Sequence, residues 1–103
     1  MSRLCLPDRR PAETAEIVFD GQRFTVTVGF YPDGRPGEVF ADGARIGSDL
    51  DALLDDACVA LSLLLQHGVD PVRLAGSMGR LGDRRPASLI GAMVDRLAGE
   101  VRL

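Results

Sequence analysis

The sequence has no lysine, and all twelve of its basic residues are arginines. Schiff-base enzymes, P-loop nucleotide-binding proteins and protein kinases each depend on a lysine amine, so these classes are excluded. A single histidine, His67, excludes a histidine-rich metal site. Two cysteines, Cys5 and Cys58, occur without C-x-x-C spacing, which argues against a disulfide-stapled secreted domain.

Long apolar runs are also missing. The longest apolar stretch, Ala57–Leu65, contains Ser62 and is too short to cross a bilayer. The first ten residues hold no apolar run long enough for a signal peptide. With 103 residues, 46% of them apolar, and a net charge of −3, we expect one small cytoplasmic domain without affinity for membranes. An irregular arm over residues 1–12 precedes the expected domain at residues 13–103.

Alternating apolar and polar residues predict three strands, over residues 15–19, 23–30 and 38–41. Asp20-Gly21 between the first two is typical of a tight hairpin turn. Pro32-Asp33-Gly34 predicts a second turn, because proline fixes the first corner and glycine accepts the last. The pattern predicts an antiparallel meander.

Three helices are expected after the strands. Ser48 begins the first, with Asp51 completing a capping box, and Gly68 ends it. Asp70-Pro71 begins a short second helix, and Pro86 begins the last. The fold class is therefore α+β, a two-layer sandwich of a three-stranded antiparallel sheet and three helices. The predicted core stripe of the long helix is Leu50, Leu53, Leu54, Ala57, Cys58, Leu61, Leu64 and Leu65.

Val59 and Leu63 lie beside that stripe, so the long helix is apolar around most of its girth. One small domain has difficulty covering such a helix by itself. We therefore predict a homodimer interface that includes Val59 and Leu63. In the alternative, the N-terminal arm of the same chain covers them.

Arg80, Arg84 and Arg85 form the most prominent cluster of charge, in a loop that also contains Gly79 and Gly82. Arginines beside a helix N-terminus can hold a phosphate, and a Gly-x-x-Gly loop between helices is typical of KH RNA-binding modules. The acidic balance of the chain and the absence of flanking aromatic residues make nucleic acid an unfavourable partner. In the alternative reading, the loop is solvated and its arginines pair with aspartates of the long helix.

Other chemistry-bearing residues have simpler interpretations. The aspartates of residues 51–56 are expected to face water opposite the leucine stripe. His67 is expected to favour the helix C-terminus as a cation, and Cys58 to act as a small apolar core residue. A small enzyme that uses His67 or Cys5 is the least favoured hypothesis, because no acid, base and nucleophile are seen together. The sequence leaves enzymatic activity open and favours a non-catalytic chain.

The order of several short motifs resembles the TSCPD domain. The motifs are Leu6-Pro7-x-Arg9-Arg10, Glu38-Val39-Phe40, the run Leu65–Pro71 and Arg85-Pro86-Ala87-Ser88. That domain lies at the C-terminus of adenosylcobalamin-dependent ribonucleotide reductases and in small stand-alone alphaproteobacterial and prophage proteins. The resemblance implies a fold similar to the iron–sulfur scaffold and an accessory role.

The family's cysteines are absent. The Thr-Ser-Cys-Pro-Asp run that names the family reads Ala87–Gly91 here, with Leu89 at the cysteine position. The other family cysteines would fall near Ala44 and Leu81, and apolar side chains cannot ligate zinc or iron. We expect no metal and no cofactor, with core residues filling the lost site.

Two functions follow. The first is a non-catalytic accessory domain that acts through protein–protein contacts, with a ribonucleotide reductase chain, a phage-related protein or a second copy as its partner. The alternative is a nucleotide- or nucleic-acid-binding module that uses the loop Gly79–Arg85.

Overall fold

The computed structural model describes residues 3–43 and 48–99 of the chain. Three strands, β1 (Ala12–Phe19), β2 (Gln22–Phe30) and β3 (Pro36–Gly43), form an antiparallel sheet in the order β1-β2-β3. The predicted meander is confirmed, with outer strands that are longer than the alternation indicated. β1 extends to Ala12 because this residue pairs with Gly29 of β2.

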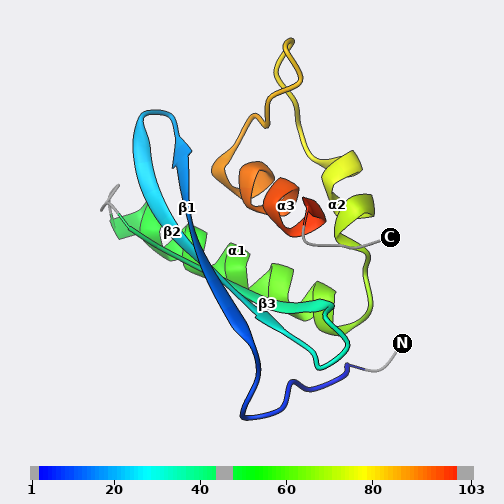
Figure 1. Cartoon of the computed structure of the whole chain (residues 1–103). Helices are drawn as coiled ribbons and strands as arrows, with labels where there is room; N and C mark the ends of the chain where they lie inside the picture. Colours follow the sequence, from blue (N-terminus) through cyan, green and yellow to red (C-terminus); the bar gives the residue numbers. More distant parts are fainter. Residues whose placement is uncertain (1–2, 44–47, 100–103) are drawn as a thin grey trace.

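Three helices follow the sheet: α1 (Ser48–Gln66), α2 (Pro71–Ser77) and α3 (Leu89–Gly99) (Figure 1). The α+β prediction is confirmed. None of the described helices is long and apolar enough to span a membrane.

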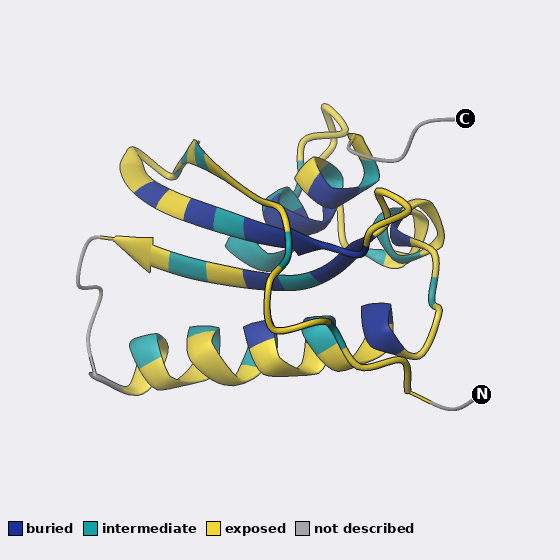
Figure 2. Cartoon of the chain, turned by 60° about the horizontal axis from the view of Figure 1, so that its bottom comes forward, coloured by how far each residue is buried: buried dark blue, intermediate teal, exposed yellow. Residues whose placement is uncertain are grey.

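The core lies between one face of the sheet and the helices. Val26 and Val28 of β2 and Val39 of β3 point to this face and are almost fully buried. Figure 2 shows the buried residues of α1 on the side that faces the strands. The other face of the sheet is open, since Val18 and Phe40 are more than half exposed. The helical residues of the core are Cys58, Leu61, Leu65, Met93, Val94 and Leu97.

Local signals at the helix ends work largely as expected. Gly68 has a φ of 88°. Its N–H donates to the Leu65 carbonyl, and the N–H of Val69 donates to the Leu64 carbonyl. This is a Schellman cap, and it ends α1. Asp70 accepts a hydrogen bond from the Val72 N–H, so it caps α2 as predicted. The predicted capping side chain of Ser48 lies outside the described residues.

The start of the last helix is a correction. α3 begins at Leu89 and not at Pro86, because Pro86 pairs with Arg80 in an antiparallel bridge. Ser88 takes the capping role instead, and its Oγ accepts a hydrogen bond from the Gly91 N–H.

Residues 3–11 run without regular structure past the C-terminal end of α1. The Leu4 N–H donates to the Gln66 carbonyl at 2.8 Å, and the Tyr31 hydroxyl donates to the Leu4 carbonyl. The Arg10 guanidinium pairs with Glu38 at 2.6 Å. Val59 of α1 nevertheless remains 58% exposed. The alternative in which the arm covers this residue is therefore wrong.

Candidate functional site

Residues 79–87 form a narrow hairpin that stands out from the helices (Figure 1). The N–H of Leu81 donates to the Arg85 carbonyl, and the N–H of Arg84 donates to the Leu81 carbonyl, both at 2.9 Å. The N–H of Ala87 donates to the Gly79 carbonyl at 3.0 Å and closes the base. Arg84 has a φ of 70°, in the left-handed region that residues other than glycine rarely adopt.

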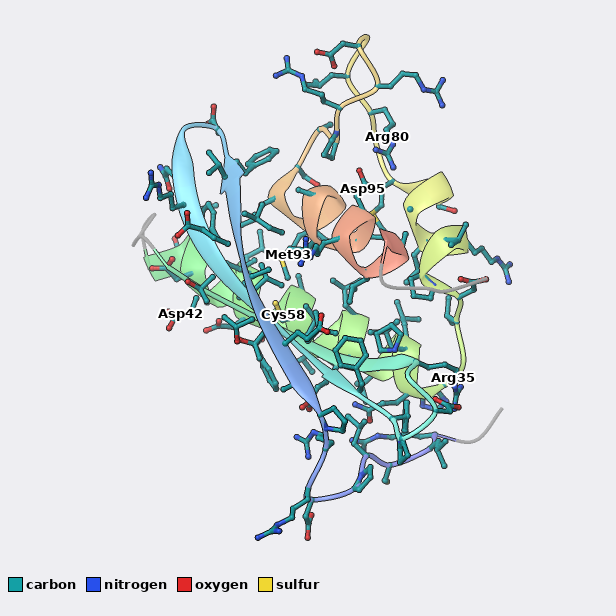
Figure 3. All side chains as sticks on the ribbon, viewed as in Figure 1. Arg35, Asp42, Cys58, Arg80, Met93 and Asp95 are labelled. Atoms are coloured by element: carbon teal, nitrogen blue, oxygen red, sulfur yellow. The ribbon has the colours of Figure 1, made fainter. Side chains whose placement is uncertain are left out.

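Arg80 fixes this hairpin to the helices. Its Nη1 and Nη2 donate to the two carboxylate oxygens of Asp95 on α3 at 2.7 and 2.6 Å. Nη2 also donates to the Ala75 carbonyl in α2 at 3.0 Å. Figure 3 shows Arg80 and Asp95 pointing toward each other between the hairpin and α3. The bidentate bond from Arg80 holds the pKa of Asp95 below its ordinary value.

The three arginines of the cluster differ in what they contact. Arg85 Nε donates to Asp83 within the hairpin at 2.5 Å. The guanidinium of Arg84 has no hydrogen-bond or ion-pair partner among residues 3–43 and 48–99. The prediction that these arginines pair with aspartates of α1 is wrong, because their partners are Asp83 and Asp95. Of the predicted binding residues, Arg84 keeps its charge most available.

A cleft of about 500 Å³ separates the hairpin from the turn between β1 and β2. One wall is the end of β1, and the other includes Leu81, Arg85 and Pro86. Leu81 is 49% exposed, so the expectation that a core residue replaces the family cysteine is wrong at this position. Leu89 does pack against the core cluster. Ala44 lies outside the described residues. The full lining is Val18, Phe19, Asp20, Leu81, Arg85, Pro86, Ala87 and Ala92.

The outer face of α1 is the second candidate site. Val59 is 58% exposed and Leu63 is 39% exposed. Three residues of the predicted core stripe also turn out to be exposed, which corrects the sequence-based assignment. They are Leu50, Leu53 and Leu64. We use "outer face of α1" for these five apolar residues, which together span about half of the helix circumference, with Val59 and Leu63 next to each other at one side of it. A face of this composition is unusual for a helix in contact with water.

The inner face of α1 forms hydrogen bonds to the backbone of β3, which hydrophobic periodicity does not predict. Ser62 Oγ accepts a hydrogen bond from the Val39 N–H at 3.0 Å and donates to the Val39 carbonyl at 3.3 Å. Gln66 Nε2 donates to the Gly37 carbonyl at 3.0 Å. Cys58, one helical turn before Ser62, interacts with the Ala41 backbone, which lowers the pKa of its thiol.

These contacts repeat regularly because the two elements run antiparallel with matching repeats. Four helical residues rise about 6 Å. Two strand residues rise about 6.6 Å. Side chains 58, 62 and 66 therefore meet the backbone of residues 41, 39 and 37. Ser62 and Gln66 were the available signal, as polar residues at four-residue spacing within an apolar stripe.

Cys58 is a structural thiol. It is buried, and burial raises its pKa, with the Ala41 hydrogen bond as a smaller opposing effect. It is therefore a protonated, unreactive thiol near neutral pH. Asp55 and Asp56 are exposed to water as expected, whereas Asp51 is half-buried; Asp51 and Asp55 border a hollow with Asp42 at the end of the sheet. In the described ranges no three His, Cys, Asp or Glu side chains are placed to hold a metal ion.

Comparison with known proteins identifies the family to which this chain belongs. A model of the TSCPD domain matches residues 3–99. The chain belongs to the TSCPD domain family. Its similar proteins include vitamin B12-dependent ribonucleotide reductases of Rhodopirellula baltica, 42% identical over 64 residues, and of Bradyrhizobium diazoefficiens, 39% identical over 64 residues. The reductase of Streptantibioticus cattleyicolor is 38% identical over 64 residues.

The match to these reductases is partial. It covers 62% of this TSCPD chain but only 6%, 5% and 11% of the three reductases. The chain therefore corresponds to a small part of much longer proteins. No solved structure gives a significant match.

The cleft beside the hairpin does not fit the vitamin B12 that the relatives' names mention. Its volume is about 500 Å³. That volume is in the range for drug-sized ligands, and a corrinoid is considerably larger. That this TSCPD chain works without a cofactor remains a prediction.

Proposed function

We propose that this TSCPD chain is a non-catalytic binding domain that acts through protein–protein contacts. The observation that carries the proposal is the outer face of α1. Its five apolar residues are between 39% and 65% exposed, while the opposite side of the same helix is packed in the core. Exposed apolar patches on small domains commonly mark contact sites.

Two partners are proposed for this face. A second copy is one, in a two-fold dimer that brings Val59 and Leu63 of both chains together. A ribonucleotide reductase chain is the other, because the relatives carry this domain within such chains. Contact with a phage-related protein and a cytoplasmic location remain predictions from the sequence.

The nucleotide-binding alternative has weaker support. Two of its three arginines, Arg80 and Arg85, already bind carboxylates of the same chain. Only Arg84 presents a guanidinium without a partner in the described part of the chain. A phosphate at this hairpin would therefore have to compete with Asp83 and Asp95.

Light scattering on wild type and on the variant Val59→Glu with Leu63→Glu tests the proposal. We expect wild type to form dimers, or to bind the reductase chain of the same organism in a pull-down, and the double variant to do neither. The matched control is Phe40→Glu with Val72→Glu, which adds the same charge at residues that are 52% and 49% exposed elsewhere. A wild type that is monomeric at tens of micromolar and does not bind the reductase would contradict the proposal.

A further inference from the structure

The outer edge of β1 carries backbone groups without partners. The Pro11 carbonyl accepts a hydrogen bond from the Phe30 N–H at 2.9 Å, which shows that odd-numbered positions face β2. Backbone groups alternate in direction along a strand, so those of Thr14, Glu16 and Val18 point away from the sheet. None of these groups has a hydrogen-bond partner in the described part of the chain.

The opposite edge of the sheet is closed. There the Gly37 carbonyl and both backbone groups of Val39 bind side chains of α1. An unpaired edge strand is a template for another strand, and proteins usually block such edges with proline, short length or a covering element. β1 has eight residues and no proline, so this edge is left available.

The cleft next to β1 sets what can bind there. Its walls are the Val18 end of β1 on one side and Leu81 and Pro86 on the other. Both sides are bounded, so the space suits one extended segment and not a second folded domain. Arg85 and Asp20 both line this cleft, and Arg85 is already paired with Asp83. Arg84 at the hairpin tip has no partner among the described residues, so it is the charge that favours a carboxylate beside this end of the cleft.

A second copy fits this edge poorly. β1 carries Glu13 and Glu16 and no basic residue. Pairing two β1 strands would bring the glutamates of both copies onto one pair of strands, where like charges are destabilising.

We propose that the outer edge of β1 binds an extended segment of another polypeptide by strand addition. Apolar side chains of the segment enter the cleft against Leu81 and Pro86, and one acidic side chain lies near Arg84. Main-chain hydrogen bonds to Thr14, Glu16 and Val18 supply affinity, and the cleft supplies selectivity. This surface is separate from the outer face of α1.

Selection from a random library of peptides of about eight residues, the length of β1, tests this. The full chain is the bait, and Glu16→Pro is the counter-selection. Proline at this edge position removes an outward N–H and leaves the pairing with β2 intact. Glu16→Gln is the matched control, because it removes the charge and keeps the N–H.

We expect enriched peptides to be extended and apolar, with a single acidic residue at the end that reaches Arg84 and none opposite Glu13 or Glu16. Glu16→Pro should weaken them about tenfold, the effect of roughly one hydrogen bond in a shielded contact, and Glu16→Gln much less. Arg84→Glu should weaken them too. Hydrogen exchange of the Thr14, Glu16 and Val18 amides should slow when peptide is added. If Glu16→Pro does not fold, peptides N-methylated at alternate amides replace it and should not bind.

Four results would overturn the proposal. Peptides that bind Glu16→Pro and wild type alike, or no enrichment at all, would show that the edge is not a binding site. Peptides that protect α1 and not β1 would place recognition at the other surface. Amides of β1 that are already protected in the free chain, increasingly so at higher protein concentration, would identify a second copy as the occupant.

Discussion

Two turns of this chain have the same hydrogen bonds and different sequences. In the first turn, Tyr31–Arg35, the N–H of Gly34 donates to the Tyr31 carbonyl, and the N–H of Tyr31 donates to the Arg35 carbonyl. The second turn, Leu81–Arg85, has the same two backbone hydrogen bonds. In each turn the aspartate at the third position, Asp33 or Asp83, accepts hydrogen bonds from the backbone N–H and the guanidinium of the arginine at the fifth position. The left-handed position is Gly34 in the first turn and Arg84 in the second.

The difference shows where strain is placed. Glycine adopts a φ of 89° at Gly34 without a steric penalty, whereas Arg84 at 70° pays one. Strained residues that persist in a structure often mark functional positions. Here the strained residue is also an arginine without a partner in the described ranges, at the tip of the candidate binding hairpin. The first turn has a glycine at this position, and the second presents a charge.

Gly34→Val should have the largest effect, since it puts a β-branched residue in the left-handed region. We expect a loss of about 1–3 kcal/mol in the free energy of unfolding. A Cβ at this position would meet no atom within 4 Å, so the loss would come from the backbone and not from a clash. Denaturant titration measures it. A loss no larger than for Gly76→Val, where a Cβ also has open space, would remove the backbone explanation.

Arg84→Gly should act in the opposite direction. It relieves the left-handed conformation and adds freedom to the unfolded chain, so we expect a net gain of up to about 1 kcal/mol. Thermal unfolding is the measurement, with Arg84→Ala as the control that keeps the strain and loses the charge. A glycine variant no more stable than the alanine variant would mean that the second turn carries no strain.

Gly82→Pro should stabilise the second turn by a smaller amount, about 0.5–1 kcal/mol. It copies Pro32 of the first turn, the Gly82 N–H has no partner among the described residues, and an added Cβ has open space. Unfolding by denaturant measures the change. A destabilised variant would show that the two turns differ at this corner despite their shared hydrogen bonds.

At low pH, the Arg80–Asp95 pair that attaches the second turn to α3 should lose more stability than the Arg35–Asp33 pair within the first turn. The Arg35 backbone N–H, followed by its guanidinium, lowers the pKa of Asp33, and Arg80 lowers the pKa of Asp95. A lowered pKa contributes stability above the ordinary value of 3.8, and that stability is lost as the pH falls through the folded-state pKa. The Asp95 side chain is 34% exposed and that of Asp33 57%, so water weakens the Asp33 pair more.

The measurement is the free energy of unfolding as a function of pH for Asp95→Asn and Asp33→Asn. Asp95→Asn should flatten the acid limb more than Asp33→Asn does. Equal slopes in the two variants would show that the greater burial of Asp95 does not matter.

The two turns also separate what was predictable from what was not. Pro-Asp-Gly at 32–34 predicted its turn, because proline and glycine occupy the positions that need them. Gly-Asp-Arg at 82–84 gives no such signal. Its glycine, Gly82, occupies a corner that any residue can adopt, and the left-handed position is taken by Arg84. The sequence therefore predicts a loop here, with Pro86 as the start of a helix, and the structure has a hairpin that contains Pro86.

The same distinction holds along α1. Leucine spacing predicted the helix, and Gly68 predicted its end. Spacing did not separate the buried Leu61 and Leu65 from the exposed Leu53 and Leu64, because all lie within one broad apolar arc. Which part of that arc meets the sheet depends on the bonds from Ser62 and Gln66 to β3.

The strands, the helices, their order and the family of this chain can be predicted from its sequence. These depend on residues close together in the chain, through periodicity, turn residues and caps. The folded structure is needed to see that Asp95 binds Arg80, that Arg84 is not paired with any described residue, and that one sheet edge is closed while the other is open. Each of these depends on side chains and backbone groups distant in the sequence, and their partners are selected only when the helices pack on the sheet.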